Sequence, residues 1–269
     1  MFKINYKYAI LLGIVAFSSF QAPAKAGSLL GTANDFGVLG GSTVTNTGPS
    51  VIMQSLGVNA GSSATGFSPG IVNGTIFTSD AVAAQAQLDN ASAYNYLAKL
   101  SPTKELTGVD LGGLTLTPGV YSFSSSAQLT GKLTLDNLGD PNALFVFQIG
   151  STLTTASNSS VVTTNGEAPN VFFQIGSSAT LGTGTQFMGN ILALTSITLT
   201  TGVNIECGRA LAQNGAVTMD TNKVSSTCYT KPKPQELAKV PEPDSSLGVL
   251  SSGMVGLLFA FSKRFRKGW

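Results

Sequence analysis

Few side chains in this sequence could perform catalysis. The chain has no histidine, so it has neither a Ser–His–Asp arrangement nor an imidazole general base. A β-rich glycosidase or lyase would need clustered carboxylates on one face. Here the acids are scattered, and Asp110, Asp136 and Asp140 stand near Gly, Asn or Pro, where turn and capping roles are common. We therefore expect no enzyme activity, no metal site and no cofactor.

The two cysteines, Cys207 and Cys228, are the only other candidates for reactive chemistry. An even pair of cysteines in an exported protein indicates a disulfide. Closing this loop would stabilise the fold by about 3 kcal/mol in the chain-entropy estimate. The alternative is two free thiols or metal ligands, but no histidine is present to complete a metal site. Glu206 and Arg209 flank Cys207, and we expect a local ion pair between them.

Hydroxyl and amide side chains recur in short windows, and these could act as a surface. The windows are Thr155-Ala156-Ser157-Asn158, Thr183-Gly184-Thr185-Gln186 and Thr201-Gly202-Val203-Asn204, and Thr221 falls on the next repeat. If Ala156, Gly184 and Gly202 face inward, the residues beside them face outward. The outward side chains would then lie about 6.6–6.8 Å apart along a strand and about 4.8 Å apart between strands. This predicts a flat, uncharged grid of methyls and hydroxyls.

The windows belong to a longer repeat. The segment FVFQIGSTLTTASNSS (145–160) returns as VFFQIGSSATLGTGTQF (171–187). Laying Leu153 on Leu181 places Thr155 on Thr183, and a shift of 18 places Leu181 on Leu199. A further shift of 20 reaches Met219, and a backward shift of 18 places Leu135 on Leu153. A period of 18–20 residues is typical of one coil of a β-solenoid. The alternative is a β-sandwich with coincidental strand spacing.

One segment, SDAVAAQAQLDNASAYNYLAKL (79–100), interrupts the β pattern. It is rich in alanine, contains neither Gly nor Pro, can be capped by Ser79 or Asp80, and is stopped by Ser101-Pro102. We predict one helix over about 80–100. Its packing face is expected to contain Val82, Ala86, Leu88, Ala93, Tyr96, Leu97 and Leu100.

Both ends of the chain are interpreted as processing segments. Lys3 and Lys7, an apolar run over 8–20 and the small residues of Ala24-Lys25-Ala26 predict a signal peptide over 1–26. At the other end, Pro241-Glu242-Pro243 lies in a linker over 231–246. An apolar run and a basic tail then occupy 247–269. These three parts resemble the PEP–C-terminal sorting signal of Gram-negative bacteria, which implies cleavage by an exosortase-type enzyme. A plain C-terminal membrane anchor is the alternative.

Between these ends, residues 27–230 are expected to form one domain. They contain 10 acidic and 5 basic residues, a net charge of about −5. Since no basic stripe is present to neutralise phosphates, nucleic acid is not an expected partner. The low charge and the regular apolar positions also exclude a disordered chain. The surface must therefore consist mostly of hydroxyls and amides.

Several long stretches of this domain resemble a known family. They are LGTANDFGVLGGSTVTNTGPS, GFSPGIVNGTIFTSDAVAAQAQ, LGGLTLTPGVYSFSSSAQLTGKLTLD, NILALTSITLTTGVN and GRALAQNGAVTMDTN. They are similar to the bacterial and fungal ice-binding family first catalogued as a domain of unknown function. The resemblance covers about residues 29–225. It implies a mainly β fold, a discontinuous right-handed β-solenoid with three faces and one long flanking helix.

The resemblance also implies a function for the predicted grid. In the family one flat face adsorbs to ice, and a Thr–Ala/Gly–x–Thr/Asn motif marks it in many members. The windows at Thr155 and Thr201 match that motif, whereas the window at Thr183 departs from it at Gln186. The expected ice-binding residues are Thr155, Ser157, Asn158, Thr183, Thr185, Thr201, Val203, Asn204 and Thr221.

We therefore expect a monomeric antifreeze protein, secreted or held at the cell surface or in the extracellular matrix. It would inhibit ice growth and recrystallisation, with the ice crystal surface and an exosortase-type enzyme as partners. One alternative is an adhesive or matrix solenoid without ice activity. A carbohydrate-binding solenoid is another, but Trp269, the only tryptophan, lies in the removable tail.

Overall fold

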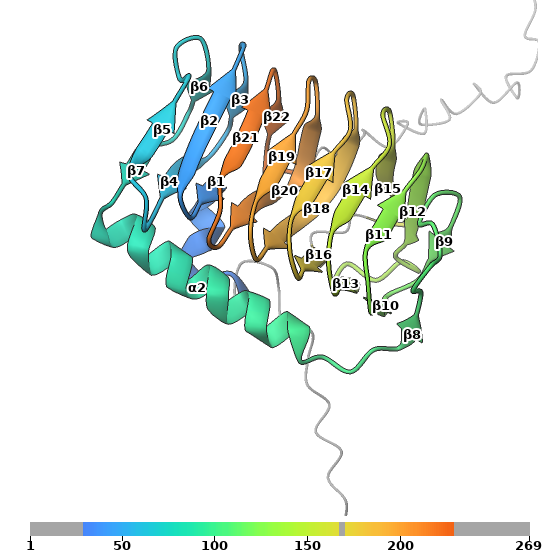
Figure 1. Ribbon diagram of the computed structural model, residues 1–269. Helices are drawn as coiled ribbons and strands as arrows, with labels where there is room; N and C mark the ends of the chain where they lie inside the picture. Colours follow the sequence, from blue (N-terminus) through green and yellow to red (C-terminus); the bar gives the residue numbers. More distant parts are fainter. Residues whose placement is uncertain (1–28, 167–169, 229–269) are drawn as a thin grey trace, which may run out of the picture. The chain divides into compact units, whose positions relative to one another are not determined.

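The computed structural model describes residues 29–166 and 170–228, which coil into a stack of parallel strands with one helix along its side (Figure 1). Every paired strand in these residues runs parallel to its neighbour, as in a solenoid and unlike the antiparallel sheets of a β-sandwich. The predicted β-solenoid is confirmed.

No helix among the described residues is both long and apolar enough to cross a membrane. The predicted signal peptide (1–26), the linker with Pro241-Glu242-Pro243 (231–246) and the sorting segment (247–269) lie outside the described residues.

One face of the solenoid is a separate seven-stranded sheet, which we call the threonine face. Its strands, in spatial order, are β11 (Ala127–Leu129), β14 (Leu153–Thr155), β17 (Ala179–Leu181), β19 (Ile197–Leu199), β21 (Val217–Asp220), β2 (Thr43–Thr47) and β5 (Ser63–Thr65).

A fifteen-stranded sheet wraps the other two sides. The part that lies against the helix, the helix face, contains β8 (Lys104–Glu105), β10 (Gly119–Phe123), β13 (Leu144–Ile149), β16 (Asn170–Ile175), β1 (Phe36–Gly40), β4 (Ser55–Val58) and β7 (Ile76–Thr78). The remaining part, the third face, contains β9 (Thr115–Leu116), β12 (Lys132–Asp136), β15 (Ser160–Thr164), β22 (Lys223–Val224), β3 (Val51–Ile52) and β6 (Ile71–Val72).

Two long strands, β18 (Gln186–Ala193) and β20 (Asn204–Ala212), bend from the third face onto the helix face. The bend requires glycine at stacked positions. Gly189 has a φ of +120°, and a Cβ on Gly208 would lie 1.8 Å from the Gly189 carbonyl oxygen. No side chain fits between the two coils at this corner.

The order of coils in space differs from their order in the chain. After the short 3₁₀-helix η1 (Gly31–Asp35), β1 enters the middle of the stack, and the first coils extend to one end, at β7. The helix α2 (Ala81–Ala98) then runs back along the stack, and the remaining coils start at β8 (Figure 1). They finish against the first coil, where β20 pairs with β1 and β21 pairs with β2. This is the discontinuous arrangement that the family resemblance implied.

The helix forms where it was predicted. The Asp80 side chain caps it by accepting a hydrogen bond from the backbone N–H of Ala83 at 2.8 Å. The predicted packing face is wrong in part, because Val82, Leu88 and Tyr96 are exposed. The buried side consists of Ala83, Ala86, Asn90, Ala93, Tyr94 and Leu97. Its small residues let the helix lie close to outward side chains of the helix face, among them Phe172 and Leu211.

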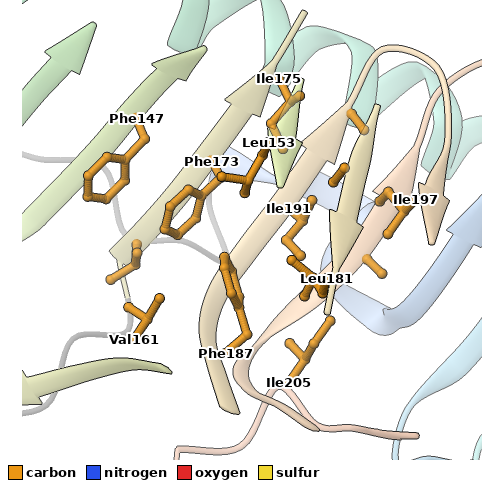
Figure 2. Close-up of a cluster of buried hydrophobic side chains, with 14 of the residues drawn as sticks. Phe147, Leu153, Val161, Phe173, Ile175, Leu181, Phe187, Ile191, Ile197 and Ile205 are labelled. Atoms are coloured by element: carbon orange, nitrogen blue, oxygen red, sulfur yellow. The ribbon is translucent and has the colours of Figure 1, made fainter. Parts of the chain in front are cut away.

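The solenoid interior is filled by side chains stacked from coil to coil (Figure 2). The Phe147 and Phe173 rings stack with centroids 4.5 Å apart, and the Phe187 ring follows 4.7 Å from that of Phe173. Because one coil alone cannot bury its inward residues, each coil depends on its neighbours for a core. The coils that begin at Tyr121 and Phe147 are longer than the next one, with 26 residues from each of these residues to its partner in the following coil.

Two features lie near the joint between the last and first coils, where β20 pairs with β1. The predicted Cys207–Cys228 disulfide is present, with Cα atoms 4.3 Å apart. The Arg209 side chain donates hydrogen bonds to the Asn34 backbone and side-chain oxygens and to Asn190 Oδ1, all within 3.0 Å. Arg209 therefore connects η1 to β18 and does not form the local pair with Glu206 that we expected. Burial lowers the pKa of Arg209 to about 10, so the side chain remains charged at neutral pH.

Replacing Arg209 should loosen this joint. Arg209→Met leaves the Asn34 and Asn190 oxygens without their donor, and we expect a loss of about 2–3 kcal/mol in the free energy of unfolding. Urea unfolding measures the loss, and amide hydrogen exchange should show faster exchange in β1 than in β13. Lys132→Met on the third face is the control, since Lys132 is exposed. Equal urea concentrations at the midpoint of unfolding for the two variants would contradict this role of Arg209.

Candidate functional site

The outward positions of the threonine face form a continuous row of threonines. In each strand the residues on either side of the outward threonine mostly point into the core, as at Ala179 and Leu181 beside Thr180. The strand register aligns these threonines across the whole sheet, including the joint between β21 and β2. We call this set the threonine row: Thr154, Thr180, Thr198, Thr218, Thr45 and Thr65, continued by Gln128 at one end.

A second row lies two residues earlier in each strand and consists mainly of serine and threonine. We call it the serine row: Ser126, Thr152, Ser178, Ser196, Ala216, Thr43 and Ser63. Sheet geometry places neighbours within a row about 4.8 Å apart and the two rows about 6.6–6.8 Å apart. Neither row contains a charged side chain.

The two rows differ in how their hydroxyls are used. In the serine row, Ser126 Oγ and Thr152 Oγ1 are hydrogen-bonded at 2.8 Å, and Ser196 Oγ accepts the Ala216 backbone N–H at 3.3 Å. Within the described residues, the hydroxyls of the threonine row have no protein partner. Their methyl and hydroxyl groups are therefore available to water along the length of the sheet.

The other two faces are not equivalent surfaces. The helix covers the helix face, where Val146, Phe172 and Leu192 are buried beneath it. On the third face the outward side chains of successive coils vary in size and charge. They include Lys132, Ser160, Gln186, Asn204 and Lys223, which are aligned across neighbouring strands. A regular, uncharged and uncovered array therefore occurs on the threonine face.

Three of the residues predicted for this surface are buried, and their predicted outward orientation is wrong. Thr155 is 3% exposed, Thr185 is 0% exposed and Val203 is 1% exposed. The error arose because Ala156, Gly184 and Gly202 were assumed to face inward. Gly184 and Gly202 are not inward strand residues but turn residues with φ of +72° and +73°, and Ala156 is exposed.

The predicted alignment of coils was wrong in the same region. Leu153 pairs with Ala179 and not with Leu181, and Leu135 pairs with Thr163 on the third face. The two later shifts are confirmed, since Leu199 pairs with both Leu181 and Met219. The coils that begin at β10 and β13 carry additional residues at the corner after β12 and after β15. A single period of 18–20 residues does not accommodate them.

Most of the other predicted residues lie at the corner between the threonine face and the third face. Asn158, Gly184, Gly202 and Thr221 all have positive φ and stack on one another. Backbone hydrogen bonds of 2.8–3.1 Å join these turns from coil to coil. The exposed residues at this corner are Ser157, Asn158, Thr183, Thr201 and Thr221, whereas Asn204 points outward on the third face.

The buried threonines hold this corner from inside. Thr155 Oγ1 and Thr185 Oγ1 are hydrogen-bonded at 2.9 Å, and Thr185 Oγ1 also donates to the Gly182 carbonyl oxygen at 2.6 Å. The Gly182 backbone N–H in turn donates to Thr155 Oγ1 at 2.9 Å. The motif hydroxyls at these positions satisfy backbone groups of the turn and do not face solvent.

The threonine row itself was missed in the sequence, although a signal for it exists. Each member follows an apolar residue, in the triplets LTT (153–155), ATL (179–181), ITL (197–199), VTM (217–219), VTN (44–46) and ATG (64–66). Alternation of apolar and polar residues within these triplets marks half-buried strands. The triplets are only three residues long, and the four-residue windows beside them were assigned to the surface in their place.

The family model for ice-binding-like proteins matches residues 38–225, which span all three faces. The chain belongs to this family. It is 84% identical to an ice-binding protein from Nostoc sp. (strain HG1), with 100% of both chains covered. This ice-binding-like family is not an enzyme family, and no group of three or more His, Cys, Asp or Glu that could hold a metal ion occurs among the described residues.

Solved structures with the same fold include an ice-binding protein from an Antarctic biological consortium. It is 49% identical, with a TM-score of 0.70, and the match covers 72% of this chain and 89% of that one. Another is an ice-binding protein from the Antarctic ascomycete Antarctomyces psychrotrophicus, 41% identical with a TM-score of 0.70. That match covers 75% of this chain and 98% of the other.

The corrected orientations make a direct prediction about stability. Thr185→Val removes a hydroxyl that holds the corner from inside, and we expect a loss of about 1–3 kcal/mol in the free energy of unfolding. Thr180→Val is the matched control, because Thr180 is exposed in the middle of the threonine row, and its effect should stay within about 0.5 kcal/mol. Thermal or urea unfolding compares the two. A larger loss for Thr180→Val would contradict the assignment of sides.

Proposed function

We propose that this protein binds ice crystals through the threonine and serine rows of the threonine face. The observation that supports this most directly is the six-membered threonine row, aligned by strand register across coils from both halves of the chain. Its spacings, about 4.8 Å by 6.6–6.8 Å, are comparable to repeats of water in ice. The relatives named above are described as ice-binding proteins.

The chemistry of threonine suits this function. Its methyl group favours cage-like order in adjacent water, and its hydroxyl hydrogen-bonds water and holds that order in place. Its χ1 is stiff, so both groups stay fixed. Adsorption of a rigid solenoid costs little conformational entropy, so many weak contacts add up along the row. A molecule held on the crystal blocks addition of water beneath it, which inhibits ice growth and recrystallisation.

A bulky substitution in the row tests the proposal. Thr180→Tyr breaks the flatness of the face at its centre, and we expect it to raise several-fold the protein concentration needed to stop recrystallisation. The measurement is grain size in an annealed ice film, together with crystal shape during growth. Because Thr180 is exposed, the melting temperature should not change.

The control is Thr134→Tyr, which makes the same change at an outward position of β12 on the third face. It should leave recrystallisation inhibition unchanged. If the wild-type protein allows the same grain growth as an inert protein, ice binding is not its function. Equal losses for the two variants would move the binding surface away from the threonine face.

We also infer that the protein is exported and trimmed at both ends. The sequence order of basic, apolar and small residues in 1–26 supports export, and Pro241-Glu242-Pro243 followed by apolar and basic residues supports exosortase-type processing. The intact mass of the protein recovered outside cells should correspond to a chain that begins at Gly27 and ends near Pro243. If 247–269 is instead a membrane anchor, the protein should be found in the membrane fraction with a mass that retains these residues.

A further inference from the structure

The corner beside the threonine face contains one carboxylate bonded to two exposed hydroxyls. Asp220, the last residue of β21, accepts a hydrogen bond from Thr201 Oγ1 at 2.5 Å through Oδ2 and from Thr221 Oγ1 at 3.0 Å through Oδ1. Thr201 belongs to the preceding coil, so the carboxylate connects two coils. Asp220 pairs with Thr47, which places the group at the joint between the last and first coils.

Thr221 occupies a backbone conformation that its side chain disfavours. Its φ is +54°, whereas the stacked turn positions Gly184, Gly202 and Gly48 are glycines with φ of +72°, +73° and +75°. A β-branched residue at positive φ is rare and strained. Glycine would satisfy the turn, so the turn itself does not require threonine.

The Thr221 side chain instead extends the exposed corner. Its hydroxyl lies over Gly48 of the next coil, 2.4 Å from where a Cβ on that glycine would be. It therefore lies against the next coil at the edge of the threonine face. Strain retained at an exposed position points to a role for the side chain outside the fold.

We propose that Asp220 is a positioning residue that fixes the hydroxyls of Thr201 and Thr221 as additional ice contacts along this corner. The inference rests on the proposed ice binding. Because both hydroxyls donate to the carboxylate, their remaining lone pairs face water in fixed directions. The carboxylate is occupied by the same two donors and is less available to organise water in competition with ice.

The effect of Thr221→Gly separates this role from a structural one. Glycine relieves the positive φ, so the melting temperature should stay the same or rise by about 2–4 °C. Inhibition of recrystallisation should nevertheless require several-fold more protein. Leu138→Gly is the matched control, since Leu138 also has a positive φ, +53°, and is 65% exposed after β12, away from the threonine face. It should raise the melting temperature without changing ice activity.

Two substitutions of Asp220 test the positioning step. Asp220→Ala removes both acceptors, and we expect a loss of ice activity similar to that of Thr221→Gly. Asp220→Asn keeps one oxygen acceptor and should restore part of the activity. The backbone N–H of Asp220, which Asn222 Oδ1 accepts at 2.6 Å, remains in both variants, so the turn is retained. Melting temperatures confirm that the variants are folded.

The outcomes separate this inference from the proposed function. Unchanged ice activity in Thr221→Gly, or unchanged or higher activity in Asp220→Ala, overturns the role of the corner even if Thr180→Tyr remains defective. A wild-type protein without ice activity overturns the proposed function itself. Partial activity in Asp220→Asn with a defect in both Thr221→Gly and Asp220→Ala supports the inference.

Discussion

Backbone hydrogen bonding between parallel coils determines where the side chains of this protein lie. The same pairing that stacks Phe147 on Phe173 inside the solenoid aligns Thr154 with Thr180 outside it. Because side chains alternate along a strand, a slip of one residue would move the inward set to the surface. Burial of the phenylalanines and leucines therefore protects the regularity of the exposed row. The same strand register therefore determines both the packing of the core and the alignment of the candidate ice-binding surface.

The chain reaches this regular stack by an irregular route. Two coils and the strand β7 are built first, the helix returns along the stack, and the later coils meet the first at β1 and β2. The threonine row crosses that joint between Thr218 and Thr45 without a change of spacing in its pairing. Arg209 has a specific part here, because its hydrogen bonds to Asn34 and Asn190 join segments that the sequence places far apart. The threonine row continues across the joint because the strands there pair in the same way as those of any other two neighbouring coils.

Much of the fold could be predicted from the sequence, because repeated apolar positions and an alanine-rich segment are local signals. The solenoid, the position of the helix and the Cys207–Cys228 pair are confirmed. The corners could not be predicted in the same way. A small residue can face the core or occupy a turn with positive φ, and only the three-dimensional pairing distinguishes these at Gly184. The same ambiguity applied to the helix, where Ala83 is buried and the larger Leu88 is exposed.

The disulfide has a mechanical consequence for the end of the described chain. The final strand, β22, contains only two residues and would separate easily from its neighbours under tension. Cys228, however, is bonded to Cys207 in β20, a nine-residue strand paired with β18, β1 and β22. A pull applied to the chain beyond Cys228 therefore enters the fold at β20 and loads several hydrogen bonds in shear at once. Strands β21 and β22, which lie between Cys207 and Cys228 in the chain, carry almost none of that load, so tension on the C-terminal side would not peel them from the stack.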